Sequence, residues 1–359
     1  MAYHTTILRQ IIEIFPRHEF ESLAKDYHMG QKFRSFNRWT QFMVMFIGQL
    51  SGRKSLRDLV MNVSAQTSKL YHLAIRPCSR ATLARVNEKQ PAALYEAVFH
   101  KLLQRCRQFA PKHRFKFNGK LYLLDATVVD LCLSVFPWAK FRKAKGAIKI
   151  HVGLDGDGYL PEFISLTDGK HHESNWSKTL RLPLGSMVVF DMGFTDYRWY
   201  ESLMENGIYF VTRLKSNARI KYLRKRSGRK AKGITVDRTI LLGNIQQQLR
   251  MVAYIDTETG KKYHYVTNAD HLDAKTIADL YKERWQIELF FKWIKQNLKI
   301  KTFLGTSHNA VLTQIWIALC VYLLLAFLKF KAQLGVSMQQ MLRLLQLNLF
   351  ERRNLIELF

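Results

Sequence analysis

The chain has 359 residues, which is too long for one small domain and long enough to bury a large core. Lysine and arginine number 56 against 28 aspartates and glutamates, so the formal net charge is +28. A surplus of this size repels itself unless a polyanion binds, and nucleic acid is the usual polyanion, with an anionic membrane surface as the alternative.

The cysteines and the N-terminal segment indicate the cellular compartment in which we expect the protein. The four cysteines are scattered, with no CxxC and no Cys/His ligand spacing, which argues against a zinc site or a disulfide framework. The first twenty residues carry polar and charged side chains through their apolar positions, unlike the continuous apolar stretch of a signal peptide. We therefore expect a protein of the reducing cytoplasm.

Residues 1–110 predict an all-α domain. The segment from Phe36 to Leu50 is apolar on most sides and ends at Ser51-Gly52, as a buried helix would. Ser55 and Ser79 each precede a further helical pattern and are suitable N-caps.

Basic residues follow the helical patterns. Arg80 and Arg85 lie in a short helix, which is compatible with a helix-turn-helix that reads duplex DNA, and an ordinary helical bundle is the alternative. From Lys101 to Leu124 there are seven lysines or arginines and no acid. This stretch predicts a basic linker that can lie along phosphates.

Alternating strand and helix patterns come next. The segments LYLLDATVVDL, AIKIHVGL and YLPEFISLT read as strands, and the turn signal Asp155-Gly156-Asp157-Gly158 joins the last two. A helical stretch, the buried strand SMVVFD, a helix and IYFVTRL complete the order β-β-β-α-β-α-β. Asp125 lies near the end of the first strand and Asp191 closes a central one, where open α/β sheets hold their ligands.

Between Leu214 and Thr267 the pattern changes. Nine cations and no acid lie between Lys215 and Lys232, so phosphates are the natural counterions of Arg224, Lys225 and Arg226. Short alternating segments with turn residues between them follow, which predicts a small β insertion.

The segment from Tyr281 to Lys295 has no Gly or Pro, and we expect one continuous helix of about four turns. At about 100° per residue, Tyr281, Arg284, Glu288 and Lys295 fall within an arc of roughly 60°. Taken alone, a surface helix with an Arg284–Glu288 charge pair explains this face equally well. A separate apolar stripe is expected to meet a core and consists of Leu280, Ile287, Phe291, Ile294 and Leu298.

The next segment, Ala310 to Leu328, is nearly long enough and apolar enough to span a bilayer. Thr313 and Gln314 lie in its first turn, and the segment follows directly on the preceding helix. We therefore expect a buried core helix that packs on the sheet beside that helix, in preference to a membrane span.

The spacing Tyr-x2-Arg-x3-Glu-x6-Lys resembles the YREK signature of insertion-sequence transposases of the DDE class. The stretch FLGTSHNAVLTQIWIA is also similar to the insertion-sequence-four family, and the resemblance extends from about Lys120 to Phe330. It implies an RNase H-like fold in which Glu288 completes a metal-binding triad with Asp125 and Asp191, with a β insertion between the second Asp and the Glu.

Three carboxylates in one pocket repel one another unless cations neutralise them. The resemblance implies two Mg²⁺ ions, for which Mn²⁺ can substitute, that activate a water or a 3′-hydroxyl and stabilise the leaving oxygen at phosphorus. Asp130 and Asp155 are rivals of Asp125 for the first position. We rank both below it, because Asp130 faces the opposite side of the strand and Asp155 is a turn residue.

Arg284 and Lys295 are candidates for phosphate contacts beside the metals, and Tyr281 for stacking at the cleaved end. For Lys295 the alternative is an ordinary solvated charge. The other predicted DNA contacts are Arg142, Lys143, Lys145, Lys149, Arg224, Lys225, Arg226, Arg80 and Arg85.

Two departures from the family pattern bear on the mechanism. Met192 follows the second Asp, where relatives often carry Arg, and the residues from Leu214 to Leu280 include no Trp. Family members that cut through a DNA hairpin use an inserted Trp to hold a flipped base, so the resemblance leaves a hairpin intermediate open.

The predicted architecture is an all-α domain (1–110), an RNase H-like core in two parts (111–213 and 268–331) around a β insertion (214–267), and a helical tail (332–359). The predicted function is a cut-and-paste DNA transposase that acts on the terminal inverted repeats of its element as a homodimer. We expect it in a bacterial cytoplasm, associated with the nucleoid when bound to double-stranded DNA. The alternatives are a metal nuclease that does not join ends, an inactive DNA-binding protein and a membrane-surface protein.

Overall fold

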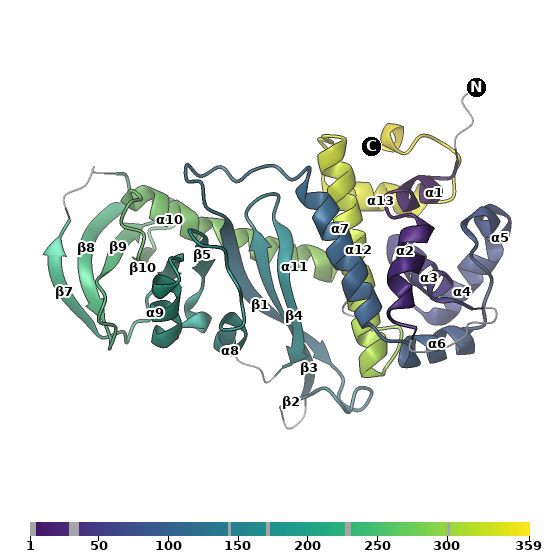
Figure 1. The fold of residues 1–359 in the computed structure, drawn as a ribbon, viewed down its shortest axis with the longest axis horizontal. Helices are drawn as coiled ribbons and strands as arrows, with labels where there is room; N and C mark the ends of the chain where they lie inside the picture. The colour runs from purple at the N-terminus through teal and green to yellow at the C-terminus, as the bar shows by residue number, and fades with distance from the viewer. Residues whose placement is uncertain are drawn as a thin grey trace. The chain divides into compact units, whose positions relative to one another are not determined.

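The chain forms two compact units, seen in Figure 1 in a computed structural model that describes residues 5–28, 36–142, 145–169, 173–226, 231–298, 300 and 302–359. We call the first the helical unit, which comprises Met1–Ala110, Val129–Ala147 and Phe291–Phe359. The second, the sheet unit, comprises Pro111–Val128 and Ile148–Phe290.

The helical unit contains the helices that the N-terminal sequence predicts. Ser55 and Ser79 are confirmed as N-caps, because their hydroxyls accept the backbone N–H groups of Asp58 and Thr82. Arg80 and Arg85 are exposed. The helices are α1 (Ile7–Ile12), α2 (Arg17–Lys25), α3 (Arg38–Leu50), α4 (Leu56–Ala65), α5 (Thr67–Leu70), α6 (Arg80–Lys89), α7 (Ala93–Arg107), α12 (His308–Lys331) and α13 (Met338–Asn348).

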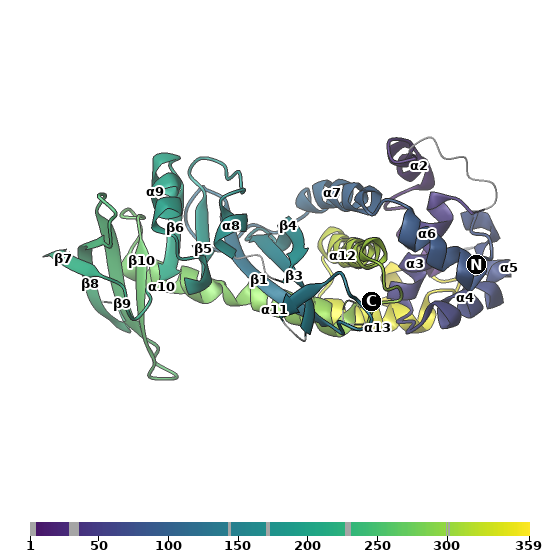
Figure 2. The same ribbon diagram turned by 90° about the horizontal axis from the view of Figure 1, so that it is seen from below.

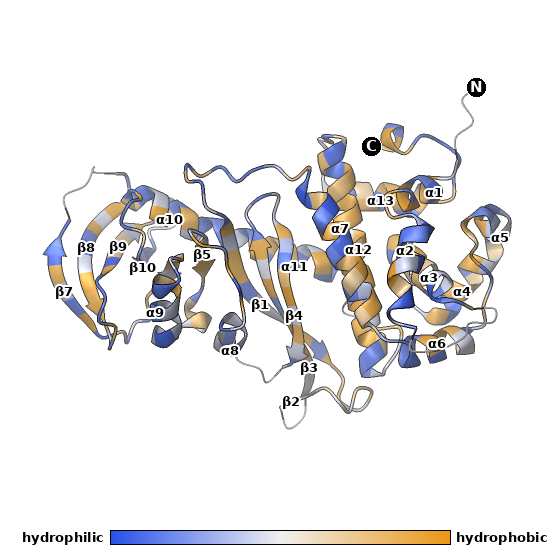
Figure 3. Ribbon diagram, in the orientation of Figure 1, coloured by the Kyte–Doolittle hydropathy of each residue, from blue (hydrophilic) through white to orange (hydrophobic). Residues whose placement is uncertain are grey.

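Helix α12 forms the core of the helical unit, and Figure 3 shows its hydrophobic colouring along most of its length. It is long and apolar enough to cross a membrane by length and composition alone, but 94% of its most apolar window is buried inside the protein. Burial of that extent is what a core helix requires. Its main partners within the helical unit are the helices α7, α3, α6 and α13. Packing of this helix on the sheet stays a prediction. Apolar periodicity alone does not predict these partners, because all of them bury apolar side chains in the same way.

The strands follow the predicted order, with the short strand β2 in addition, and β2 belongs to the helical unit (Figures 1 and 2). Across the sheet the order is β3-β1-β5-β6-β10-β9-β8-β7, and β2 and β4 pair with β3. The central strands β1, β5 and β6 are parallel. The strands are β1 (Leu121–Leu131), β2 (Lys140–Arg142), β3 (Lys145–Asp155), β4 (Leu160–Asp168), β5 (Met187–Phe190), β6 (Tyr209–Arg213), β7 (Ile220–Lys225), β8 (Ile234–Leu242), β9 (Leu249–Ile255) and β10 (Lys262–Thr267).

The predicted β insertion is not a separate sheet, because its strands continue the central one. Strand β10 pairs antiparallel with β6, in the register Thr267↔Val211, and β9, β8 and β7 extend the sheet from there. Strand β7 forms the far edge.

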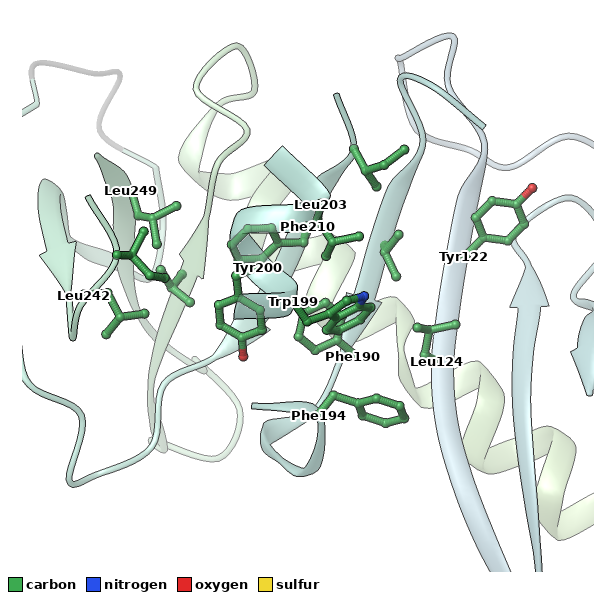
Figure 4. Close-up of a cluster of buried hydrophobic side chains, with 14 of the residues drawn as sticks. Tyr122, Leu124, Phe190, Phe194, Trp199, Tyr200, Leu203, Phe210, Leu242 and Leu249 are labelled. Carbon is green, nitrogen blue, oxygen red and sulfur yellow. The ribbon is translucent and has the colours of Figure 1, made fainter. Parts of the chain in front are cut away.

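An aromatic core fixes the central strands of the sheet unit. Figure 4 shows Phe190 of β5 and Phe210 of β6 beside Trp199 and Tyr200 of α9 (Tyr197–Glu205). The rings of Phe190 and Trp199 lie 4.8 Å apart between centroids, and those of Tyr200 and Phe210 lie 4.9 Å apart. Because Phe190 precedes Asp191 directly, this packing determines where the aspartate emerges from the sheet.

The segment from Tyr281 to Lys295 is not one helix. Helix α10 (Ala274–Glu283) ends at Arg284, and α11 (Trp285–Asn297) begins directly after it. The break has no Gly or Pro, so the sequence did not predict it. The carboxylate of Glu283, the last residue of α10, is buried and paired with Arg114 and Tyr159. The predicted apolar stripe is confirmed, since Leu280, Ile287, Phe291, Ile294 and Leu298 are all buried.

Candidate active site

Asp125 and Asp191 each follow the last paired residue of two neighbouring parallel strands. Asp191 comes directly after β5, whereas Asp125 lies inside β1, which runs on to Leu131 beyond the strand end that the sequence predicts. Strands β1 and β5 pair in the register Leu124↔Phe190, so each aspartate directly follows one member of a paired position. The side chain of Asp191 then caps a short 3₁₀ turn, and its Oδ1 accepts the N–H of Gly193 at 2.8 Å. Both carboxylates therefore belong to the carboxyl edge of the central strands, the usual ligand side of such sheets.

Glu288 reaches this edge through Arg284, the residue at the helix break. Arg284 Nη1 lies 3.3 Å from Asp125 Oδ2, and Nη2 lies 2.5 Å from Glu288 Oε1. The guanidinium is largely buried, and its Nε has no hydrogen-bond partner in the described part of the chain. It therefore bridges a carboxylate from a strand and one from a helix. We call Asp125, Asp191, Glu288 and Arg284 the acidic edge.

The role of Asp125, Asp191 and Glu288 as metal ligands stays a prediction. Among the described residues, no three Asp, Glu, His or Cys side chains are grouped closely enough to hold a metal ion. In this structure the Arg284 guanidinium supplies the positive charge between Asp125 and Glu288. Without a cation, carboxylates at this distance would repel one another.

The pKa values of both aspartates are raised, mainly by burial. Burial is the main cause that raises the pKa of Asp125 to about 7; the charges of Asp191 and Glu173 add to it, while the Ala126 N–H and Arg284 oppose it. Burial also raises the pKa of Asp191, again with a contribution from Glu173. Negative charge at the acidic edge is therefore incompletely neutralised by the protein.

Glu173 is a residue that the sequence analysis missed. It begins the short helix α8 (Glu173–Ser177), and its Oε1 pairs with Lys149 Nζ at 2.7 Å. Its charge acts on both Asp125 and Asp191. Only its place in the loop after a predicted strand could have indicated it, because no motif spacing links it to the other acids.

Tyr281 lies beside Arg284. The Arg284 guanidinium carbon is 5.6 Å from the centroid of the Tyr281 ring, and the ring of Tyr265 from β10 lies 4.7 Å from the same ring. Strand β10 of the insertion thus supports a residue of the YREK signature. Stacking of Tyr281 on a DNA end stays a prediction.

The rivals for the first position are placed elsewhere. Asp130 is exposed in the helical unit. Asp155 is buried and its Oδ2 pairs with Lys120 Nζ at 2.7 Å, while its Oδ1 accepts the N–H of Asp157. Asp155 therefore stabilises the β3–β4 turn, as its position in the sequence indicates.

The predicted DNA-contacting cations differ in their surroundings. Lys143 lies outside the described residues, and so do the side chains of Arg142 and Lys145. Lys149 is only 13% exposed and pairs with Glu173, so it is not a free surface cation. Lys295 lies in the last turn of α11, within the helical unit.

The cations of β7 are exposed, with one exception. Arg224 and Lys225 lie on the surface of the edge strand. Arg226 pairs with Asp270 at 2.8 Å and approaches Asp237 at 3.9 Å. The expectation that no acid neutralises this group is therefore wrong for Arg226, because the acids come from distant parts of the chain.

The acidic edge suits a hard divalent cation. Its carboxylate oxygens are the donors that Mg²⁺ and Mn²⁺ prefer. The Arg284 guanidinium already supplies a positive charge between two of them. Gly193 lets these side chains approach the backbone closely, since a Cβ there would lie 2.1 Å from Glu173 Oε2 and 3.0 Å from Asp191 Oδ1.

The fold and the acidic edge define an RNase H-like domain of the kind that cuts DNA with carboxylates. The Transposase DDE domain family matches residues 116–324, and the chain belongs to this family of DDE transposases, enzymes that act on DNA. Residues 3–76 match a second family whose function is unknown.

The relatives are insertion-sequence transposases. The chain is 33% identical to a Sinorhizobium fredii protein named as a transposase (y4zB), over 76% of this chain and 78% of that protein. It is 26% identical to a Geobacillus stearothermophilus protein named as the transposase of insertion sequence element IS5377, over 94% and 89%. The fold is similar to that of the piggyBac transposase in a synaptic complex with hairpin DNA, with a TM-score of 0.52, 12% identity and 96% and 80% coverage.

The raised pKa of Asp125 predicts how stability changes with pH in metal-free buffer. The folded state holds this proton more tightly than the unfolded state does, so ionisation costs stability as pH rises from about 4 to about 7. Asp125→Asn removes this cost. The unfolding free energy of the variant should therefore rise relative to that of wild type as pH rises, by up to about 1.4 kcal/mol per pH unit across that window. Urea unfolding in EDTA at several pH values measures it, and a difference that does not change with pH would contradict it.

Proposed function

We propose that this transposase binds the terminal inverted repeats of its own element and catalyses strand cleavage and strand transfer at the acidic edge. The observation that best supports this is the Arg284 guanidinium, which pairs with Asp125 and Glu288 in the same site as Asp191. Acids from two strands and one helix thus meet at one cationic centre. An ordinary surface charge pair on a helix would not involve the strand carboxylate.

Asp125, Asp191 and Glu288 are the residues that would hold two divalent ions, Mg²⁺ or Mn²⁺. Such ions supply activation of a water or 3′-hydroxyl and stabilisation of the leaving oxygen in an in-line displacement at phosphorus. A cation held by these carboxylates replaces the charge that Arg284 provides here. The guanidinium, with an unused Nε donor, is then available to bind a phosphate.

Two further surfaces are suited to duplex DNA. Exposed Arg224 and Lys225 on the edge strand β7 supply sequence-independent attraction to phosphates. Helices α3, α4 and α6 pack together in the helical unit, and Arg80 and Arg85 of α6 are exposed there, where they can read the end sequence. Cleavage and joining of two element ends at once favours a homodimer. We place the protein in the cytoplasm, on the nucleoid when it is bound to DNA.

The direct test is incubation of the protein with DNA that carries an element end, in Mg²⁺. Wild type should nick at the end and then join it to target DNA. Asp191→Asn and Glu288→Gln should lose both activities and bind end DNA in EDTA as wild type does, because the removed charges face metal. Glu205→Gln, at an exposed acid of α9, is the matched control and should remain active.

Two outcomes would decide against the proposal. Nicked ends with no joined product indicate the alternative, a metal nuclease. Activity that survives in both acid variants moves the active site elsewhere.

The cations of β7 predict a change in the salt dependence of binding. Arg224→Ala with Lys225→Ala should weaken binding to all DNA sequences and flatten the log-log salt slope by up to about two units. Arg226→Ala is the control; it should leave the slope nearly unchanged, because Asp270 and Asp237 already neutralise this charge. Fluorescence anisotropy at several salt concentrations measures the slope. An unchanged slope in the double variant would remove β7 from the DNA interface.

A further inference from the structure

Glu173 brings a fourth carboxylate to the acidic edge. Its Oε2 lies over Gly193, 2.1 Å from where a Cβ on that residue would be. Asp191 Oδ1 lies 3.0 Å from the same point. Two carboxylates from different elements therefore lie close together against the backbone of Gly193, where a side chain would collide with Glu173.

The charges around Gly193 do not balance. Asp125, Asp191, Glu288 and Glu173 face two cations, Arg284 and Lys149. Lys149 and Glu173 are 13% and 21% exposed, so water screens their surroundings poorly. An excess of negative charge in so confined a place favours a divalent cation.

We propose that Glu173 is a fourth carboxylate of the divalent-cation site and would help Asp191 to hold the ion. The inference rests on the proposed function, since it adds a residue to the same site. In this account Lys149 neutralises Glu173 until a metal ion does so. The competing account is structural: Glu173 only neutralises the buried Lys149.

Binding of Mn²⁺ to the full-length protein, followed by the electron paramagnetic resonance signal of free Mn²⁺, distinguishes the two accounts without any assay of activity. Glu173→Gln should weaken Mn²⁺ binding about 10- to 100-fold, as loss of metal-site carboxylates and their supporting groups does. Glu173→Asp keeps the charge and should recover most of the affinity. The exposed acid variant Glu205→Gln should bind as wild type does.

The double variant Glu173→Gln with Lys149→Met gives the sharpest comparison. It removes both charges, so no unpaired buried lysine is left to disturb the site. Under the proposal Mn²⁺ binding stays weak in this variant. Under the structural account it returns to the wild-type affinity, and that result would overturn the proposal. Circular dichroism confirms that each variant is folded.

Asp191→Asn separates this inference from the proposed function. If Asp191→Asn loses Mn²⁺ binding and Glu173→Gln keeps it, Glu173 is not part of the metal site, and the function stands. If Mn²⁺ binding is unchanged in both variants, the acidic edge is not the metal site and both proposals fail.

Discussion

Mutual repulsion of buried carboxylates is the constraint on which the active-site region depends. Asp125, Asp191 and Glu288 gather at one edge, and burial raises the pKa of both aspartates. Arg284 offsets part of the repulsion, since one guanidinium pairs with Asp125 and Glu288 together. Its position at the break between α10 and α11 directs it there. An arginine between two acids is a physical means of holding them together without a metal ion.

The sheet unit determines where these groups lie. Parallel register places Asp125 and Asp191 one residue beyond the paired positions Leu124 and Phe190, and the aromatic core holds Phe190 in place. The insertion contributes as well, because β10 pairs with β6 and places Tyr265 against Tyr281. The insertion is therefore a structural part of the catalytic sheet, and its edge strand β7 carries the exposed cations.

The sequence was sufficient to predict those features that depend on neighbouring residues alone. Ser55 and Ser79 were predicted as caps from their own neighbours, and the stripe from Leu280 to Leu298 from helical periodicity. The strand order and the family followed from pattern and from the YREK signature. Predictions failed where distant residues decide: Asp270 neutralises Arg226, and Glu173 joins the acids without a motif. The break at Arg284 has no breaker residue at all.

The central claim is that the acidic edge holds divalent cations in exchange for the Arg284 bridge. Anomalous diffraction from crystals grown with Mn²⁺ tests it most directly, because the ions are located by their own scattering. The account predicts Mn²⁺ peaks among Asp125, Asp191 and Glu288, with the Arg284 guanidinium no longer between Asp125 and Glu288. Mn²⁺ bound only elsewhere, with the Arg284 bridge intact, would contradict it.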